Sequence, residues 1–197
     1  MNTMPNSSLI IALILMALGL AVVAWLVAQR QRSLRLKRRF GPEYDVAVSE
    51  FHSRTKAEAE LLKREQRVAA FTIVPLSSAD SARFSQTWNA LQIRFIDNPK
   101  GVVGEADLLV RELMAKRGYP MGDFEHRAAD ISVDHPRVVS NYRAAQAIAA
   151  RDAEGKADTE ELRKAVIHYR TLFDELLGAA PEKAPLRAAP RDVAVHS

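Results

Sequence analysis

An uncharged stretch of twenty residues near the amino terminus constrains this chain more than any other feature. It runs from Leu9 to Ala28, reads LIIALILMALGLAVVAWLVA, and contains one glycine and no proline. As a helix it would span about 30 Å, which matches the hydrocarbon core of a bilayer. A helix packed on a soluble domain usually keeps a polar stripe, and this stretch has none. The sequence therefore predicts a transmembrane helix over residues 9–28.

The charges on either side of this helix indicate its orientation. Residues 1–8 carry no charged side chain, whereas residues 29–39 carry six basic residues and no acid. Basic residues beside a membrane helix stay on the cytoplasmic side. We therefore expect a single-pass protein of the inner membrane, with residues 1–8 outside and the carboxyl-terminal part cytoplasmic. A cleaved signal peptide fits less well, because no basic segment precedes the helix and no clear cleavage site follows it.

The six basic residues define a juxtamembrane segment over residues 29–43, and we call them the basic belt. The belt consists of Arg30, Arg32, Arg35, Lys37, Arg38 and Arg39. The net charge of the whole chain is +4, whereas residues 40–197 hold 22 Lys and Arg against 24 Asp and Glu. This near-neutral remainder argues against a nucleic-acid partner, which needs basic charge over a folded face. The belt residues are instead predicted to contact the anionic headgroups of the lipid bilayer.

Small residues line one face of the predicted membrane helix. They recur at spacings of four, three and four, which would let two such helices approach closely. These residues are Ala17, Ala21, Ala24 and Ala28. A homo-oligomer through this face is one interpretation. The other is that alanine is common in membrane helices.

The segment over residues 44–70 is rich in helix formers and in charged residues. A heptad frame places apolar residues along one seam, but Glu58 and Glu65 occupy the same seam. Two acids in the seam make a long coiled coil unfavourable. We therefore predict a charged, solvated helical stalk that packs at its ends. Pairing with a partner helix is the alternative.

Residues 71–178 are predicted to form a compact bundle of four main helices and a short one. Apolar residues recur with helical periodicity, and an aromatic stripe runs along Phe84, Trp88, Leu91 and Phe95. Ser77 and Asn98 are candidate N-caps, the second followed by a proline. Residues 179–197 are rich in Pro and Ala and are predicted to be disordered. The fold class is therefore all-α, with a membrane helix, a stalk and a bundle.

Several short motifs resemble those of a family of bacterial single-pass membrane proteins. They are RRFGPEYD at 38–45, WNALQIRFIDN at 88–98, RGYP at 117–120, SVDHP at 132–136 and YRAAQAI at 142–148. The resemblance implies an anchored helical domain. It implies no activity, because none is established for that family.

One cluster of polar residues could carry chemistry, because carboxylates with imidazoles can bind metal or transfer protons. It comprises Asp123, Glu125, His126, Asp130, Asp134 and His135. Their spacing matches no metalloprotease or di-iron motif. We expect Asp134 or His135 to cap the helix that follows, and His168 to play a structural role. No metal and no cofactor are predicted, and the absence of cysteine excludes disulfides and thiolate ligands.

These observations favour a non-enzymatic, membrane-anchored interaction or scaffold protein with a protein partner of unknown identity. Two alternatives remain. One is a metal-dependent or acid–base enzyme that uses the Asp123–His135 region. The other is an anchored domain that faces the cell envelope.

Overall fold

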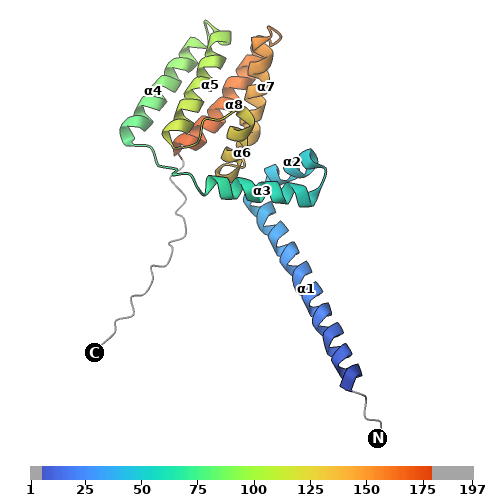
Figure 1. Ribbon diagram of the computed structural model, residues 1–197. Helices are drawn as coiled ribbons and strands as arrows, with labels where there is room; N and C mark the ends of the chain where they lie inside the picture. The colour runs from blue at the N-terminus through green and yellow to red at the C-terminus, as the bar shows by residue number, and fades with distance from the viewer. Residues whose placement is uncertain (1–5, 179–197) are drawn as a thin grey trace, which may run out of the picture.

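The computed structural model describes residues 6–178, and within them the chain forms eight helices and no strand. The predicted all-α class is therefore confirmed. Figure 1 shows one long helix, α1, that projects from a group formed by all the others. The expected disordered tail at 179–197, and most of the expected tail at 1–8, lie outside the described residues.

Helix α1 (Asn6–Phe40) is longer than the apolar stretch that begins it. From Ile10 onward it is long and apolar enough to cross a membrane, and its apolar part is not buried by the rest of the protein. Trp25, near the end of that part, is 60% exposed. The helix continues without a break through the whole basic belt. The belt residues therefore occupy its last turns.

The segment that we predicted as a single stalk consists of two helices, α2 (Pro42–Phe51) and α3 (Arg54–Val68). The break lies at His52, whose φ of 49° is left-handed, and at Ser53, whose side chain accepts a hydrogen bond from the Lys56 amide. Helix α3 folds back along α2, so that Tyr44 reaches Glu58. The predicted solvated stalk is instead a packed unit.

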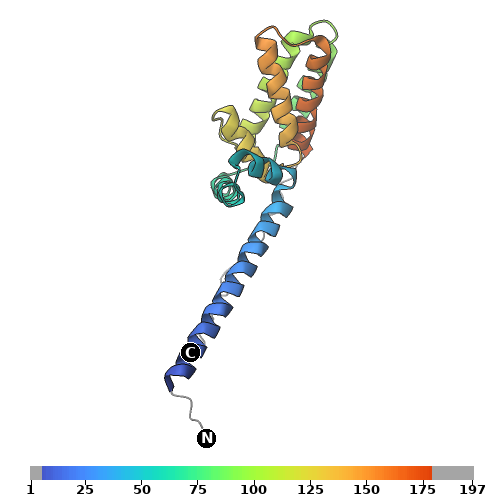
Figure 2. The same ribbon diagram turned by 90° about the vertical axis from the view of Figure 1, so that its right-hand side faces the viewer.

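This unit has a small core of its own, which the end of α1 completes. We call the end of α1 from Ser33, with α2 and α3, the collar. Figures 1 and 2 show α3 lying across the upper end of α1, next to the bundle. The core residues of the collar, with one residue from α6, are Leu36, Phe40, Tyr44, Ala47, Ala57, Leu61, Val68 and Val133.

The bundle consists of α4 (Ser78–Arg94), α5 (Pro99–Lys116), α6 (Phe124–Asp134), α7 (Val139–Ala153) and α8 (Thr159–Gly178). The predicted aromatic stripe faces its core, since Phe84, Trp88 and Leu91 are at most 2% exposed. The Trp88 ring stacks on Phe173 of α8, with the ring centroids 4.7 Å apart.

The predicted caps begin their helices as expected. Ser77 accepts a hydrogen bond from the Asp80 amide at 3.0 Å, and Asn98 accepts one from the Gly101 amide at 3.2 Å. Each cap satisfies a backbone N–H that has no partner inside its helix.

The prediction that Asp134 or His135 caps the helix after it, α7, is wrong. Asp134 is the last residue of α6, His135 follows it as the C-cap, and α7 begins after Val138 without a side-chain cap. Both polar residues have other partners. Asp134 accepts a hydrogen bond from the Tyr119 hydroxyl at 2.8 Å, and His135 Nδ1 lies 3.1 Å from a Glu175 oxygen.

The connector between α3 and α4 is held against the end of α5. The Val74 amide donates to the Arg117 carbonyl oxygen at 2.9 Å. Gly118 ends α5 with a φ of 95°, and a Cβ at this position would lie 2.3 Å from the Thr72 carbonyl oxygen. Glycine is therefore needed here both for the backbone conformation and for the close approach of the connector.

Candidate functional site: the juxtamembrane arginine grooves

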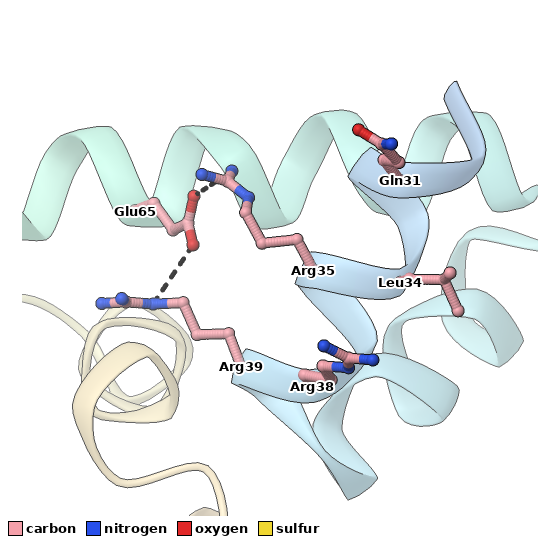
Figure 3. A pocket seen from close by; sticks show the side chains of 6 residues that line it. All are labelled: Gln31, Leu34, Arg35, Arg38, Arg39 and Glu65. Atoms are coloured by element: carbon pink, nitrogen blue, oxygen red, sulfur yellow. Dashed lines mark hydrogen bonds and ion pairs between the residues drawn. The ribbon is translucent and has the colours of Figure 1, made fainter. Parts of the chain in front are cut away.

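The crossing of α3 over α1 leaves an open groove beside the basic belt. Figure 3 shows this groove, whose volume is about 630 Å³. Its lining is almost entirely from α1, and α3 contributes one carboxylate. The lining residues are Gln31, Leu34, Arg35, Arg38, Arg39 and Glu65.

Glu65 binds two of the three arginines in this groove. One of its oxygens lies 3.0 Å from Arg35 Nη2, and the other lies 3.1 Å from Arg39 Nε (Figure 3). The Glu65 side chain is only 17% exposed. Three arginines and one carboxylate leave the groove with a net charge of about +2 at neutral pH, because guanidinium groups do not lose their protons.

The structure thus divides the basic belt into two sets. Arg35 and Arg39 pair with Glu65, and Lys37 lies 3.6 Å from Asp45. Among residues 6–178, no carboxylate forms an ion pair with any member of the second set, which comprises Arg30, Arg32 and Arg38. This second set is the part of the belt whose charge remains available to an external anion.

A second groove of about 520 Å³ lies on the other side of the crossing. It is lined by Leu26, Gln29, Arg30, Ser33, Leu34, Arg54, Thr55 and Glu58. The acid in this groove is also bound within the protein. Glu58 accepts hydrogen bonds from the Ser33 hydroxyl at 2.6 Å, the Tyr44 hydroxyl at 2.7 Å and Arg54 Nε at 3.0 Å.

Two opposing effects act on the Glu58 carboxyl. Burial raises its pKa, but the hydrogen bonds from Ser33, Tyr44 and Arg54 together lower the pKa below its ordinary value. Glu58 is therefore ionised at neutral pH and engaged by its neighbours. The two acids that α3 presents to α1 hold the two helices together.

The chemistry that these grooves offer is the binding of an anion. Guanidinium groups donate several hydrogen bonds in a planar fork, which matches phosphate oxygens well. An anion at the first groove would meet Arg38 and the outer N–H groups of Arg35. Contact between the belt residues and lipid stays a prediction.

The acid–histidine region does not gather into one site. Asp123 caps α6 by accepting from the His126 amide at 2.9 Å, and its carboxylate also lies 2.9 Å from the His126 ring. The backbone amide of His126, and after it the ring, hold the pKa of Asp123 below its usual value. Asp130 binds Arg67 of α3 at 2.7 Å, whereas Glu125 is exposed.

Each remaining member of that region has its own partner elsewhere, as described for Asp134 and His135. Within the described part of the chain, no three His, Cys, Asp or Glu side chains are grouped so that they could hold a metal ion. His168 Nδ1 lies 2.8 Å from the Asn141 side-chain oxygen, in line with the structural role expected for it.

No sequence pattern indicated the ionic cluster that is most buried among the described residues. Glu43 of α2 is 2% exposed and lies 3.1 Å from Arg64 Nη1 of α3. Arg143 of α7 binds both oxygens of Glu43, at 2.6 and 2.7 Å. Glu43 and Arg143 are 100 residues apart, so no local pattern could pair them. This cluster ties the collar to the bundle.

No family model, no curated protein and no solved structure matches this chain. The resemblance to the bacterial single-pass family is thus an expectation that rests on the motifs given above.

Proposed function

We propose that this protein is a non-enzymatic, membrane-anchored helical platform, whose bundle binds a protein partner at the cytoplasmic face of the inner membrane. The observation that carries this proposal is the continuity of α1. The helix passes without a break from its apolar part into the collar, where Leu36 and Phe40 are fully buried. No flexible linker therefore separates the apolar segment from the collar within α1.

Two ionic contacts between the collar and the bundle support a fixed position of the bundle relative to α1. Glu43 links the collar to α7 through Arg143, and Arg67 of the collar binds the buried Asp130 of α6. Breaking a buried ion pair is strongly destabilising, because one charge is then left without its partner. The platform would therefore present the bundle at a constant height and orientation above the bilayer.

The charges of the belt support both the orientation and the choice of lipid. Six cations follow the apolar part of α1, and none precedes it within residues 1–8. Arg30, Arg32 and Arg38, which have no carboxylate partner within residues 6–178, are the members that would contact anionic headgroups. Each such charge contributes about 1 kcal/mol near an anionic surface, and salt weakens the effect.

The orientation predicts the behaviour of a reporter fused after Ser197. A periplasm-dependent enzyme such as alkaline phosphatase should stay inactive there, because the positive flank keeps the carboxyl-terminal part in the cytoplasm. A reporter that is active only in the cytoplasm provides the matched control and should be active at the same position. The opposite pair of results would favour the envelope-facing alternative.

A partner should be detectable by cross-linking in intact membranes. Ile96, at the turn after α4, is 82% exposed and is the most exposed large apolar side chain of the bundle. A photo-reactive amino acid at Ile96 should link one protein reproducibly, whereas the same group at Arg163, exposed on α8, should not. Stoichiometric metal in the purified full-length protein, with no cross-linked partner, would instead favour the enzyme alternative.

A further inference from the structure

Helix α3 carries an uncharged strip of which only Leu62 packs, in part, against the collar core. Eight of its 15 residues are charged, and three uncharged ones, Ala57, Leu61 and Val68, are buried in the collar core. The four remaining uncharged residues of α3, together with its C-cap residue, form the strip. They are spaced by four, three, four and three residues, so they share one face of the helix. They are Thr55, Ala59, Leu62, Gln66 and Ala69, all exposed except Leu62, which is half-buried.

The contacts of α3 determine which way this strip faces. The bundle lies on another side of the helix, where Arg67 binds Asp130 and Val68 packs in the cluster that contains Val133. Thr55, the first residue of the strip, instead lines a groove with Leu26 of the apolar part of α1. The strip therefore faces back along α1, away from the bundle, as the position of α3 in Figures 1 and 2 allows.

The height of α3 above the apolar stretch follows from where it touches α1. Glu58 contacts Ser33, which lies five residues beyond Ala28, and the collar core begins at Leu36. At 1.5 Å per residue, the axis of α3 lies about 8–12 Å past the end of the apolar stretch. A helix has a radius of about 5 Å, so its underside lies about 3–7 Å past that end. The polar layer of a bilayer is about 5–7 Å thick on each side.

The charges around the strip suit a surface of lipid phosphates. Lys56 and Lys63 lie on the same side of α3, are exposed, and form no ion pair within residues 6–178. The acids nearest to α1, Glu58 and Glu65, are already bound by hydroxyl groups and arginines. An anionic surface would thus meet free cations and few free carboxylates.

We propose that α3 lies flat in the headgroup layer of the membrane that α1 crosses, with its uncharged strip against the lipid. Lys56 and Lys63 bind phosphates of anionic lipids on one side of the strip, and Arg30 binds them beside α1. The partner of this surface is an anionic phospholipid bilayer. The inference rests on the proposed function only in requiring that α1 spans the membrane.

The depth of a spin label on the strip tests this placement. The chain contains no cysteine, so Ala59→Cys gives a single labelling site in the full-length protein. The protein is placed in nanodiscs of phosphatidylcholine and phosphatidylglycerol, and Ala90→Cys on the exposed face of α4 is the control. The label at residue 59 should be several-fold less accessible to a water-soluble nickel complex than the label at residue 90, and more accessible to oxygen.

A third label separates this inference from the anchoring itself. Val22→Cys lies in the apolar part of α1 and should show the strongest protection from nickel. If residue 22 is accessible to nickel, the anchored platform is wrong. If residue 22 is protected but residues 59 and 90 behave alike, the placement of α3 is overturned. Shielding of residue 59 from both reagents would mean a protein contact and would also overturn it.

The charge contribution is tested in the same nanodiscs. Replacing Lys56 and Lys63 by glutamine should raise the nickel accessibility of residue 59 towards that of residue 90. The change should be smaller when the nanodiscs contain phosphatidylcholine alone. An equal effect in the two lipids would overturn the role of the lysines in binding anionic lipid.

Discussion

Replacing Trp88 by alanine should lower the free energy of unfolding of the bundle by about 3–5 kcal/mol. The Trp88 side chain is 2% exposed, and its ring stacks on Phe173, so the truncation removes a large buried surface and leaves a cavity. For a domain of roughly 60–100 residues, each kcal/mol lowers the melting temperature by about 4–8 °C. Thermal unfolding of the full-length protein, followed by circular dichroism, should therefore show a large shift or a bundle that is no longer cooperatively folded.

Two further variants make this measurement specific. Trp88→Phe should retain most of the stability, because the stacked ring is kept and the Trp88 Nε1 atom has no hydrogen-bond partner in the structure. Arg94→Ala removes an ion pair with Glu105 whose side chains are 53% and 43% exposed, and should cost about 1 kcal/mol or less. If Trp88→Ala melts like the wild type, the aromatic stripe does not form the core of the bundle.

Replacing Glu43 by alanine should cost about 3–5 kcal/mol, because the buried Arg64 would lose its hydrogen-bonded partner. Only Glu60 would remain near it, 3.6 Å from Arg64 Nε and beyond hydrogen-bond distance. Arg64 is 6% exposed at its side chain, and its Nε atom already lacks a hydrogen bond. Arg143 would lose both of its short contacts with the carboxylate. Arg143 donates both of these hydrogen bonds, and they raise its pKa in the wild type. In the variant Arg143 cannot relieve the loss by giving up its proton, because a guanidinium group stays protonated in proteins.

The control for Glu43 is Asp174→Ala, which removes an ion pair with Arg170 within α8. The two side chains of that pair are 43% and 52% exposed, so the expected cost is at most about 1 kcal/mol. Beyond the loss of stability, Glu43→Ala should loosen the collar from the bundle. Hydrogen exchange should then increase in α2 and α3 more than in α5 and α8. An equal increase of hydrogen exchange in all four helices would contradict a linking role for Glu43.

The sequence alone determined those features that depend on neighbouring residues. The length and composition of the stretch from Leu9 to Ala28 are sufficient for a helix that can cross a membrane. Ser77 and Asn98 begin their helices because a cap acts within three residues of its own position. The burial of Phe84 and Trp88 followed from the helical period, because one face of a bundle helix must be apolar.

The tertiary structure decided how the charged residues are used. The sequence between 44 and 70 predicts an exposed stalk, because Glu58 and Glu65 would weaken a coiled-coil seam. In the fold, Glu58 receives hydrogen bonds from Ser33 and Tyr44, and Glu65 binds two arginines of the belt. Acids that are unfavourable in one packing are therefore satisfied in another.

The tertiary structure also decided the partner of Asp134, which was predicted to be a cap, and the partners of Glu43 in the buried ionic cluster. Asp134 can cap a helix or accept a hydrogen bond from Tyr119, and the sequence contains no information on which partner lies nearer. Glu43 meets Arg143 across 100 residues of chain, and that contact exists only because the fold brings the start of α2 near α7. A charge obtains its partner from three-dimensional proximity, whereas a cap or an apolar stripe depends on spacing along the chain.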